Sequence, residues 1–352
     1  DGETLARRAA DGKGLTRPEL AVLLSNAKLV LQDAIEASDL SSDPAAEPLL
    51  LADFPEQLRE TFRKQLLAHR LRNEIVATGV ANRIVNRMGL VHPFELAEEE
   101  GAGLDHVAAA FVAARELLGM DPVWEAIDTG EMPETARLML FDQAAVALRG
   151  HMADLLRAGG ATLSPSEVIG DVAESVAELM SHVDDLLAAE ARDHSQAIAA
   201  KLTAEGAPEE LAIMVATLFS LDGAIGLSRL SRQTGVSPVE LANAFIELGE
   251  NLGLDWAQSR AAVMNPSDPW ERLLVAGLAR DFQQMRFDFL RGIAGNKRAK
   301  DGPQAQLASW LEAHEQAIRQ FRAMIGRAQS ANPLSPAMLA QIASQARNLL
   351  QR

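Results

Sequence analysis

Apolar residues recur every three or four positions along most of the chain, which is the spacing of one face of an α-helix. The first clear stripe is formed by Leu20, Leu23, Leu24, Ala27, Val30, Leu31 and Ile35. Thr16 is the expected N-cap of this helix, with Pro18 in the first turn and Glu19 placed as in a capping box. These signals predict a helix that begins directly after Thr16.

A second helical pattern lies between residues 53 and 89 and ends in the stretch HRLRNEIVATGVANRIVNRMG. At about 100° per residue, one stripe of this stretch contains Leu71, Ile75, Gly79, Asn82, Asn86 and Gly89. The apolar surface is widened on one side by Val76, Val80 and Ile84, and beside it cluster Arg72, Arg83 and Arg87. The favoured interpretation is a helix packed on more than one side, in which Asn82 and Asn86 join the arginines in a polar network, because buried asparagines need hydrogen-bond partners.

The longest stripe follows the segment GGATLSP at residues 159–165. Ser164 is the expected cap of a helix running from Pro165 to about Ala204. Its apolar positions are Val168, Val172, Val176, Leu179, Val183, Leu186, Leu187, Ile198 and Leu202. This pattern is typical of an antiparallel bundle or coiled-coil face. We therefore predict a helical subdomain over residues 1–160 and a helical bundle over residues 161–352.

Further helical stretches are predicted at 104–118, 122–128, 133–158, 208–220, 227–234, 238–251, 256–264, 269–292, 304–328 and 336–350. No run of alternating apolar and polar residues indicates a strand. The predicted fold class is all-α, with multi-helix bundles and long amphipathic helices, and without a Rossmann domain.

Charge and composition exclude several function classes. The 352 residues carry a formal net charge of −16, which argues against sequence-independent nucleic-acid binding and against anchorage to anionic lipid. No stretch is apolar for long enough to span a bilayer, and the absence of cysteine excludes disulfides and thiolate sites. The first residues lack an initiator Met and a signal-peptide pattern, so we expect a piece of a longer protein, and the absence of cysteine is compatible with a reducing cytoplasm. Neither nucleic acid nor membrane is an expected partner.

No catalytic, cofactor-binding or metal-ligating residue emerges from the motifs. No phosphate-binding glycine pattern follows a predicted strand, and no two of the seven histidines stand four residues apart on a helix. The stretch LSRLSRQTGVSPVELANAFIEL has the spacing of a helix-turn-helix. Its second helix, however, carries Glu240, Glu247 and Glu250 without any basic residue, and these carboxylates would repel phosphates. We interpret this stretch as an αα-hairpin in the core.

Several stretches, in this order, resemble the C-terminal part of the large bacterial NAD-specific glutamate dehydrogenases: GKGLTRPELAVLLSNAKLVL, FPEQLRETF, HRLRNEIVATGVANRIVNRMG, WAQSR and DPWERLLVAGLARDFQQMRFDFLRG. The resemblance extends over essentially the whole chain and is strongest from Gly12 to Gly89. It implies a very long parent enzyme that converts L-glutamate, NAD and water to 2-oxoglutarate, ammonia and NADH. It also implies that the catalytic residues and the NAD-binding domain lie N-terminal to the matched region.

The resemblance thus implies a non-catalytic region without a cofactor of its own, serving subunit assembly or structural support. Its expected partners are the catalytic domain of the same chain and further copies in a homo-oligomer. The alternative is an allosteric regulatory domain, in which Arg72, Arg83 and Arg87 would bind an anionic effector. A third hypothesis, that the chain is itself an enzyme, has the least support because no site chemistry is present in its motifs.

Overall fold

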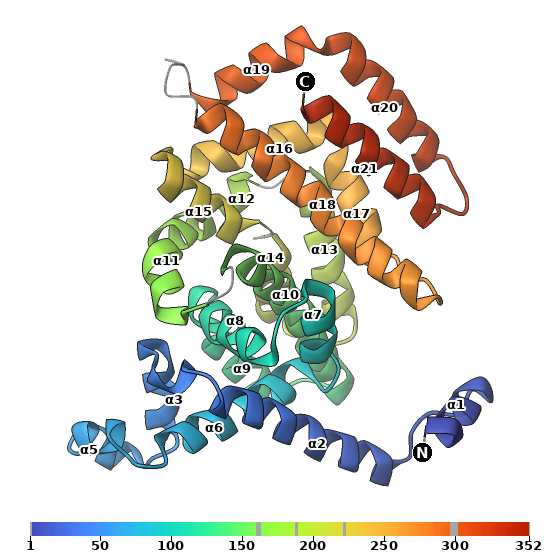
Figure 1. Ribbon diagram of the computed structural model, residues 1–352. Helices are drawn as coiled ribbons and strands as arrows, with labels where there is room; N and C mark the ends of the chain where they lie inside the picture. The colour runs from blue at the N-terminus through green and yellow to red at the C-terminus, as the bar shows by residue number, and fades with distance from the viewer. Residues whose placement is uncertain (1, 160–162, 187–188, 221–222, 296–301, 352) are drawn as a thin grey trace. The chain divides into compact units, whose positions relative to one another are not determined.

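The computed structural model describes residues 2–159, 163–186, 189–220, 223–295 and 302–351. These residues form α-helices and two short 3-10 helices, with no strand in the described ranges (Figure 1). The all-α prediction is therefore confirmed. The predicted domain boundary between residues 160 and 161 lies outside the described residues and stays a prediction.

The chain forms two compact units, and each is considered by itself. The first unit comprises Asp1–Ala114 and Gly159–Ser166, and the second comprises Arg115–Ala158 and Glu167–Arg352. The helices of the first unit are α1 (Gly2–Ala10), α2 (Arg17–Glu36), η1 (Leu40–Ser42), η2 (Pro44–Ala46), α3 (Glu47–Ala52), α4 (Glu56–Arg59), α5 (Arg63–Leu67), α6 (Arg72–Met88), α7 (His92–Glu100) and most of α8 (Leu104–Leu117).

The second unit contains the remaining helices. They are α9 (Met120–Thr129), α10 (Glu134–Gly159), α11 (Pro165–Ser181), α12 (Val183–Leu186), α13 (Ala189–Ala204), α14 (Glu209–Ser220), α15 (Ala224–Thr234), α16 (Pro238–Leu252), α17 (Leu254–Val263), α18 (Pro269–Ala294), α19 (Pro303–Ala313), α20 (Glu315–Gln329) and α21 (Pro336–Leu350). Within this unit α18 packs along α17 and α21, and α16 packs on α15 and α19 (Figure 1).

The start of α2 follows the predicted capping pattern. The backbone N–H and the hydroxyl of Thr16 both donate to Oε2 of Glu19, each at 2.7 Å. Pro18 occupies the first turn, where its missing N–H removes no helical hydrogen bond. The predicted N-terminus of this helix is therefore confirmed at the level of single atoms.

The buried face of α6 differs from the predicted one. The buried residues are Val76, Ala77, Val80, Ala81, Ile84, Val85 and Met88, and they lie against α2 and α3. Leu71 and Asn86 of the predicted stripe are exposed, and Asn82 is half-buried. The predicted burial of Val76, Val80 and Ile84 is confirmed, but the predicted burial of the stripe that contains Leu71 and Asn86 is wrong. The bulkier apolar set on the neighbouring face removes more surface from water and so decides which side is buried.

The predicted helix from Pro165 to Ala204 is divided into α11, α12 and α13. The first break falls at His182, whose ring Nδ1–H donates to the Glu178 carbonyl at 3.0 Å while the Ser181 hydroxyl donates to the same oxygen. The backbone N–H of His182 bonds to the Leu179 carbonyl instead. Side chains that occupy a helical acceptor compete with the regular ladder. The prediction failed because the apolar stripe carries no information about this competition.

The predicted helix 304–328 is also divided, into α19 and α20, and again at a histidine. The ring of His314 contacts the Trp310 carbonyl at 2.9 Å and stacks on the Trp310 ring with the centroids 4.8 Å apart. Local side-chain contacts of this kind end a helix without proline or glycine.

The predicted αα-hairpin is confirmed by α15 and α16. Gly235 joins them with a φ of +74°, and the Ser231 hydroxyl donates to the Val236 carbonyl at 2.6 Å. Ser237 caps α16 by accepting from the Val239 N–H at 3.2 Å. The second helix buries eight residues, among them the fully buried Leu241, so its apolar face belongs to the core of the second unit.

Candidate functional site

The five residues singled out in the sequence lie along α6 and do not form one cluster. Arg72 is the first residue of the helix, and its guanidinium donates to the Leu67 carbonyl at 3.3 Å. Arg83 lies eleven positions later, which corresponds to about 16 Å along a helix axis. A small dicarboxylate cannot bridge guanidinium groups at that separation along one helix. A shared anion site would therefore involve Arg83 and Arg87, which are one helical turn apart.

Arg83 lies beside an acidic side chain of the same unit. A Cβ atom added to Gly79 would lie 3.0 Å from a guanidinium nitrogen of Arg83 and 3.1 Å from Oδ2 of Asp53. Glycine at this position therefore leaves room for both charged groups next to the helix. A carboxylate so close to Arg83 lowers the electrostatic attraction of the site for an anion.

Asparagines connect α6 to α2 at two places. Asn86 accepts a hydrogen bond from the Lys28 ammonium at 3.2 Å. Asn73 donates to the Glu36 carbonyl at 2.8 Å, which provides one of the last carbonyls of α2 with a donor. The sequence analysis singled out Asn86 but missed Asn73, whose role depends on a helix 37 residues away. These contacts favour a structural role, while a binding role for Arg72, Asn82, Arg83, Asn86 or Arg87 stays a prediction.

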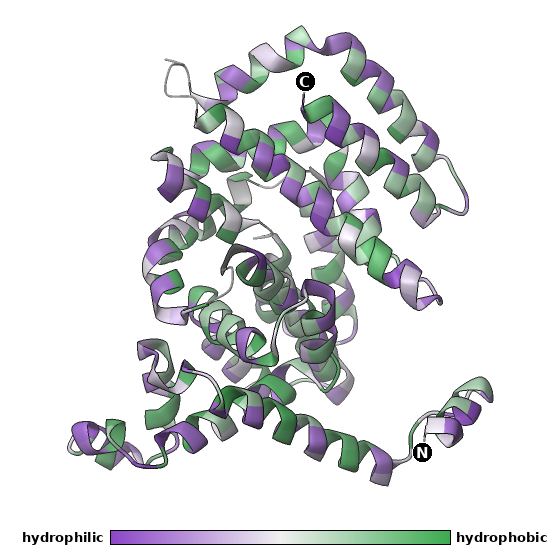
Figure 2. Cartoon of the chain, viewed as in Figure 1, coloured by the Kyte–Doolittle hydropathy of each residue, from purple (hydrophilic) through white to green (hydrophobic). Residues whose placement is uncertain are grey.

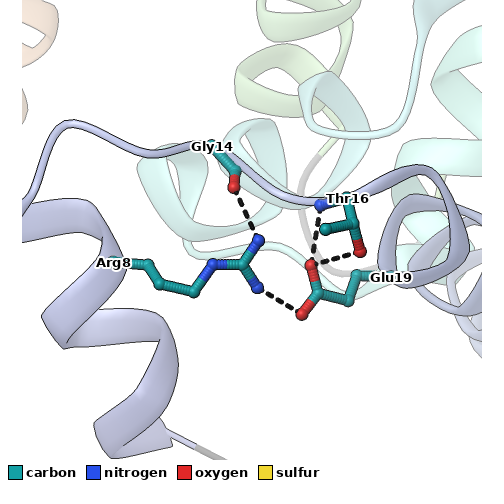
Figure 3. Close-up of polar contacts among 4 residues, drawn as sticks. All are labelled: Arg8, Gly14, Thr16 and Glu19. Carbon is teal, nitrogen blue, oxygen red and sulfur yellow. Dashed lines mark hydrogen bonds and ion pairs between the residues drawn. The ribbon is translucent and has the colours of Figure 1, made fainter.

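A set of polar contacts among Arg8, Gly14, Thr16 and Glu19, which we call the hook, connects α1 to the start of α2 (Figure 3). The Arg8 guanidinium forms an ion pair with Glu19 and also donates to the Gly14 carbonyl at 3.0 Å. Hydrogen bonds from the Thr16 backbone, the Thr16 hydroxyl and Arg8 lower the pKa of Glu19 from 4.5 to about 2. The carboxylate therefore stays ionised at every ordinary pH and holds the turn between the two helices.

A cavity of about 380 Å³ lies within the second unit. One face of α18 lines it with residues spaced three or four apart, namely Ala276, Ala279, Arg280, Gln283 and Arg286. Residues of α10 and α17 line it as well, including His151, Asp154, Arg157, Asp255 and Gln258. Cavities of this size with convergent polar groups are typical of small-molecule sites.

The polar wall of this cavity is organised around Arg286, which is only 3% exposed. Its guanidinium forms an ion pair with Asp255, donates to the Gln258 side chain and lies over the Phe245 ring at 3.9 Å from the centroid. A second pair joins Arg157 to Asp154 at 3.0 Å, and Arg157 also donates to Gln283 at 3.1 Å. Both cavity carboxylates are thus matched by a guanidinium.

Two histidines complete the polar wall. His151 is buried, and its Nε2–H donates to the Leu218 carbonyl at 2.9 Å. Desolvation, with the nearby positive charge of Arg260, lowers the pKa of His194, which keeps this ring neutral at pH 7. The cavity was not predicted from the sequence, because its walls come from helices more than a hundred residues apart. The recurrence of polar residues on one face of α18 is the signal that points to it.

The described ranges contain neither a cluster of metal-ligating side chains nor a single helix of membrane-spanning length and composition. No group of three or more His, Asp or Glu side chains there is arranged to hold a metal ion. No single helix of the same ranges has the length and apolar composition to cross a bilayer, although α14 and α15 taken together do. Their apolar residues, such as Leu211, Val215 and Leu230, are buried within the second unit.

The chain is similar to known proteins over nearly its whole length. Residues 12–348 match the model of a family described as glutamate dehydrogenase, C-terminal. The NAD-specific glutamate dehydrogenase of Halomonas elongata is 30% identical over 92% of this chain and 20% of its own length. That of Pseudomonas aeruginosa is 29% identical over 96% and 21%. That of Mycobacterium tuberculosis is 27% identical over 79% and 17%. The chain therefore spans about a fifth of the length of these relatives.

Proposed function

The chain belongs to the glutamate dehydrogenase C-terminal family, and from this premise we propose that it is a non-catalytic region that supports the assembly of an NAD-specific glutamate dehydrogenase. In this proposal, glutamate oxidation and NAD binding belong to the other four fifths of a longer cytoplasmic enzyme. The helical region packs on that catalytic part and helps to hold the subunits of a homo-oligomer together.

The observation that carries this proposal is the apolar surface of α2. Its inner face is buried through Ala27, Leu31 and Ile35. Six further large apolar side chains on the same helix are at least 40% exposed: Leu20, Val22, Leu23, Leu24, Leu29 and Val30. Figure 2 shows hydrophobic bands along most of this helix. A helix that is apolar all round is typically enclosed by protein, and large exposed apolar patches mark interaction surfaces.

We assign the exposed side of α2 to the catalytic part of the same enzyme. The relatives contain about four times as much polypeptide outside the matched region as inside it, so a large partner surface belongs to the same chain. Fully burying a Leu or Val side chain contributes about 1.5–3 kcal/mol. Six half-exposed side chains therefore provide several kilocalories per mole for docking.

Charge substitutions on α2 of the full-length enzyme test this assignment. Val22 and Leu29 are 60% and 55% exposed, so V22D and L29D change side chains that lie mostly outside the core of the first unit. L138D is the matched control, because Leu138 is also 60% exposed but lies on α10. We expect the α2 variants to lower specific activity and to dissociate the oligomer or increase its protease sensitivity. The isolated chain should melt as before.

The result that overturns the proposal is an oligomer and an activity in V22D/L29D that match those of L138D and wild type. Deletion of the whole region provides a second test. If the shortened enzyme kept its oligomeric state and its activity, the assembly role would be refuted. Light scattering and mass photometry measure the first quantity, and glutamate-dependent NAD reduction measures the second.

A further inference from the structure

The first turns of α18 carry an apolar stripe that the second unit leaves largely uncovered. Among the large apolar side chains of the described residues, Trp270 is the most exposed, at 79%, and Leu274 is 42% exposed. Leu273 and Gly277 are half-buried. These four positions have the spacing i, i+3, i+4 and i+7, which places them on one face of the helix. Figure 1 shows the first turns of α18 projecting at the edge of the second unit.

The same face of α18 is covered farther along the helix. Asp281 lies seven positions after Leu274 and eleven after Trp270, so all three residues lie on one side of α18. On this side α18 packs on α21, where Arg347 donates to Asp281 at 2.9 Å. Asp268 caps the bare end by accepting from the backbone N–H of Trp270 at 2.9 Å, so the stripe belongs to a formed helix. The packing that α21 provides to the later turns is thus missing from the first two.

The stripe matches itself in shape. Trp270 is a large projection, whereas Gly277 is a gap, because a Cβ added there would meet a single atom within 4 Å, Nη2 of Arg280 at 3.5 Å. When two such stripes meet antiparallel about a two-fold axis, Trp270 of each copy lies over Gly277 of the other. Leu273 and Leu274 then meet across the axis. A two-fold contact requires a surface that is complementary to itself, and this stripe meets the requirement.

The composition of the stripe favours protein as its partner. It contains no charged side chain, so nucleic acid and anionic lipid have nothing to bind. Tryptophan is enriched among the residues that dominate the binding energy of protein interfaces. Aromatic side chains bury about 150–250 Å² each, so two stripes bury on the order of 600 Å² in total. Such a small contact is weak in the isolated chain and gains strength in an enzyme whose subunits other contacts hold close.

We infer that this stripe is a two-fold contact between the second units of two copies of the chain, with Trp270 of each copy over Gly277 of the other. The inference rests on the assembly proposal and deepens it, because it names a surface through which two subunits meet. The α2 surface belongs to the first unit, so the two assignments fail separately. A 352-residue chain that stays monomeric overturns this contact and leaves the docking of α2 intact. Unchanged assembly in V22D/L29D overturns the α2 assignment and leaves this contact intact.

Analytical ultracentrifugation of the 352-residue chain tests the contact. We expect a monomer at low concentration and a dimer at high concentration, with a Kd on the order of 10–100 μM for so small an interface. W270A should weaken dimerisation at least about tenfold, because it removes the central anchor. L138A is the control, since Leu138 is also 60% exposed but lies on α10. A monomer at all concentrations up to about 500 μM would overturn the inference, as would equal losses in W270A and L138A.

G277L tests the gap without altering the tryptophan. A leucine fills the space in which Trp270 of the other copy docks, so dimerisation should weaken at least about tenfold. Replacing a glycine inside a helix favours the folded chain, so the thermal unfolding midpoint of G277L should not fall. This second measurement separates a lost contact from a lost fold. A folded G277L that dimerises as strongly as the wild type would overturn the proposed pairing.

A spin label measures the orientation of the two helices. The chain has no cysteine, so Q284C gives a single labelling site, and Gln284 is exposed on α18. At about 1.5 Å per residue, two labels should lie about 30 Å apart in the antiparallel dimer but only about 10 Å apart in a parallel one. A distance near 10 Å would overturn the antiparallel contact. Iodide should quench Trp270 in the dilute monomer and spare it in the dimer; shielding in the monomer would mean that the same chain covers Trp270, which also overturns the inference.

Discussion

Replacing Arg286 by methionine should destabilise the second unit by about 3 kcal/mol, because it removes the guanidinium partner of a carboxylate inside the protein. Arg286 is 3% exposed, and the side chain of Asp255 is 17% exposed. Breaking a buried ion pair from one side costs about 3–5 kcal/mol. The partial exposure of Asp255 lets water solvate the remaining carboxylate. The expected loss of stability therefore lies at the lower end of this range. Methionine replaces the apolar stem of the arginine but not its guanidinium, so the hydrogen bond to Gln258 and the contact with the Phe245 ring are lost together with the charge.

A double-mutant cycle separates the ion pair from the packing. In R286M/D255N neither charge is present, so the double variant should regain part of the loss and unfold within about 1–2 kcal/mol of the wild type. R319M is the control, since Arg319 pairs with Glu315 on the surface of α20 and both side chains are more than 70% exposed. Such an exposed pair contributes about 0.3–0.5 kcal/mol to the free energy of unfolding, so R319M should lose no more than this.

Urea unfolding measures these differences. Trp256, one of the four tryptophans of the chain, is the neighbour of Asp255 on α17 and contributes to the fluorescence that follows unfolding. The reasoning is refuted if R286M costs no more than R319M. It is also refuted if the losses of R286M and D255N simply add in the double variant, because additivity would mean that the two charges do not interact.

Two further predictions concern a close contact and a titrating group. Alanine at Gly226 would place a Cβ 2.4 Å from the Phe287 ring, so G226A should destabilise the second unit by about 1–3 kcal/mol in urea unfolding. G170A is the control, because Gly170 lies in open space on α11. This variant should instead stabilise the second unit by about 0.5–1 kcal/mol. The lowered pKa of Glu19 means that its stabilisation of the hook is complete above pH 4.5 and is lost as the pH falls towards 2. NMR should therefore show the Glu19 carboxyl group titrating near pH 2 in the wild type, and R8Q should raise this midpoint. A wild-type midpoint near 4.5 would contradict the hook.

The starts of two capped helices were predicted correctly from the sequence. Thr16 and Glu19 cap α2 as their spacing predicts, and α16 begins at Pro238 after its Ser237 cap. Such signals succeed because the donor and the acceptor are two or three residues apart and need no distant partner. The all-α class follows from the same local information, since the 3.6-residue period recurs along the chain.

Signals that depend on a distant partner were read less well. On α6 the predicted stripe through Asn82 and Asn86 lies beside the face that α2 covers. Asn73, which no periodicity distinguishes, bonds the Glu36 carbonyl of α2. The breaks at His182 and His314 were also missed although their contacts are local. They depend on ring nitrogens that bond a carbonyl four residues back, and an apolar pattern does not report such contacts.

The sequence alone thus determined the fold class, the capped starts of α2 and α16, and the family, because each depends on local spacing or on similarity along the chain. Only the tertiary structure decided which faces are buried, left the apolar side of α2 exposed, and joined α10, α17 and α18 around a cavity. The physical reason is that helix caps form within one turn of the chain. The Arg286–Asp255 pair instead connects residues 31 positions apart, and the Arg157–Gln283 hydrogen bond connects residues 126 positions apart. These contacts exist only after the helices have packed.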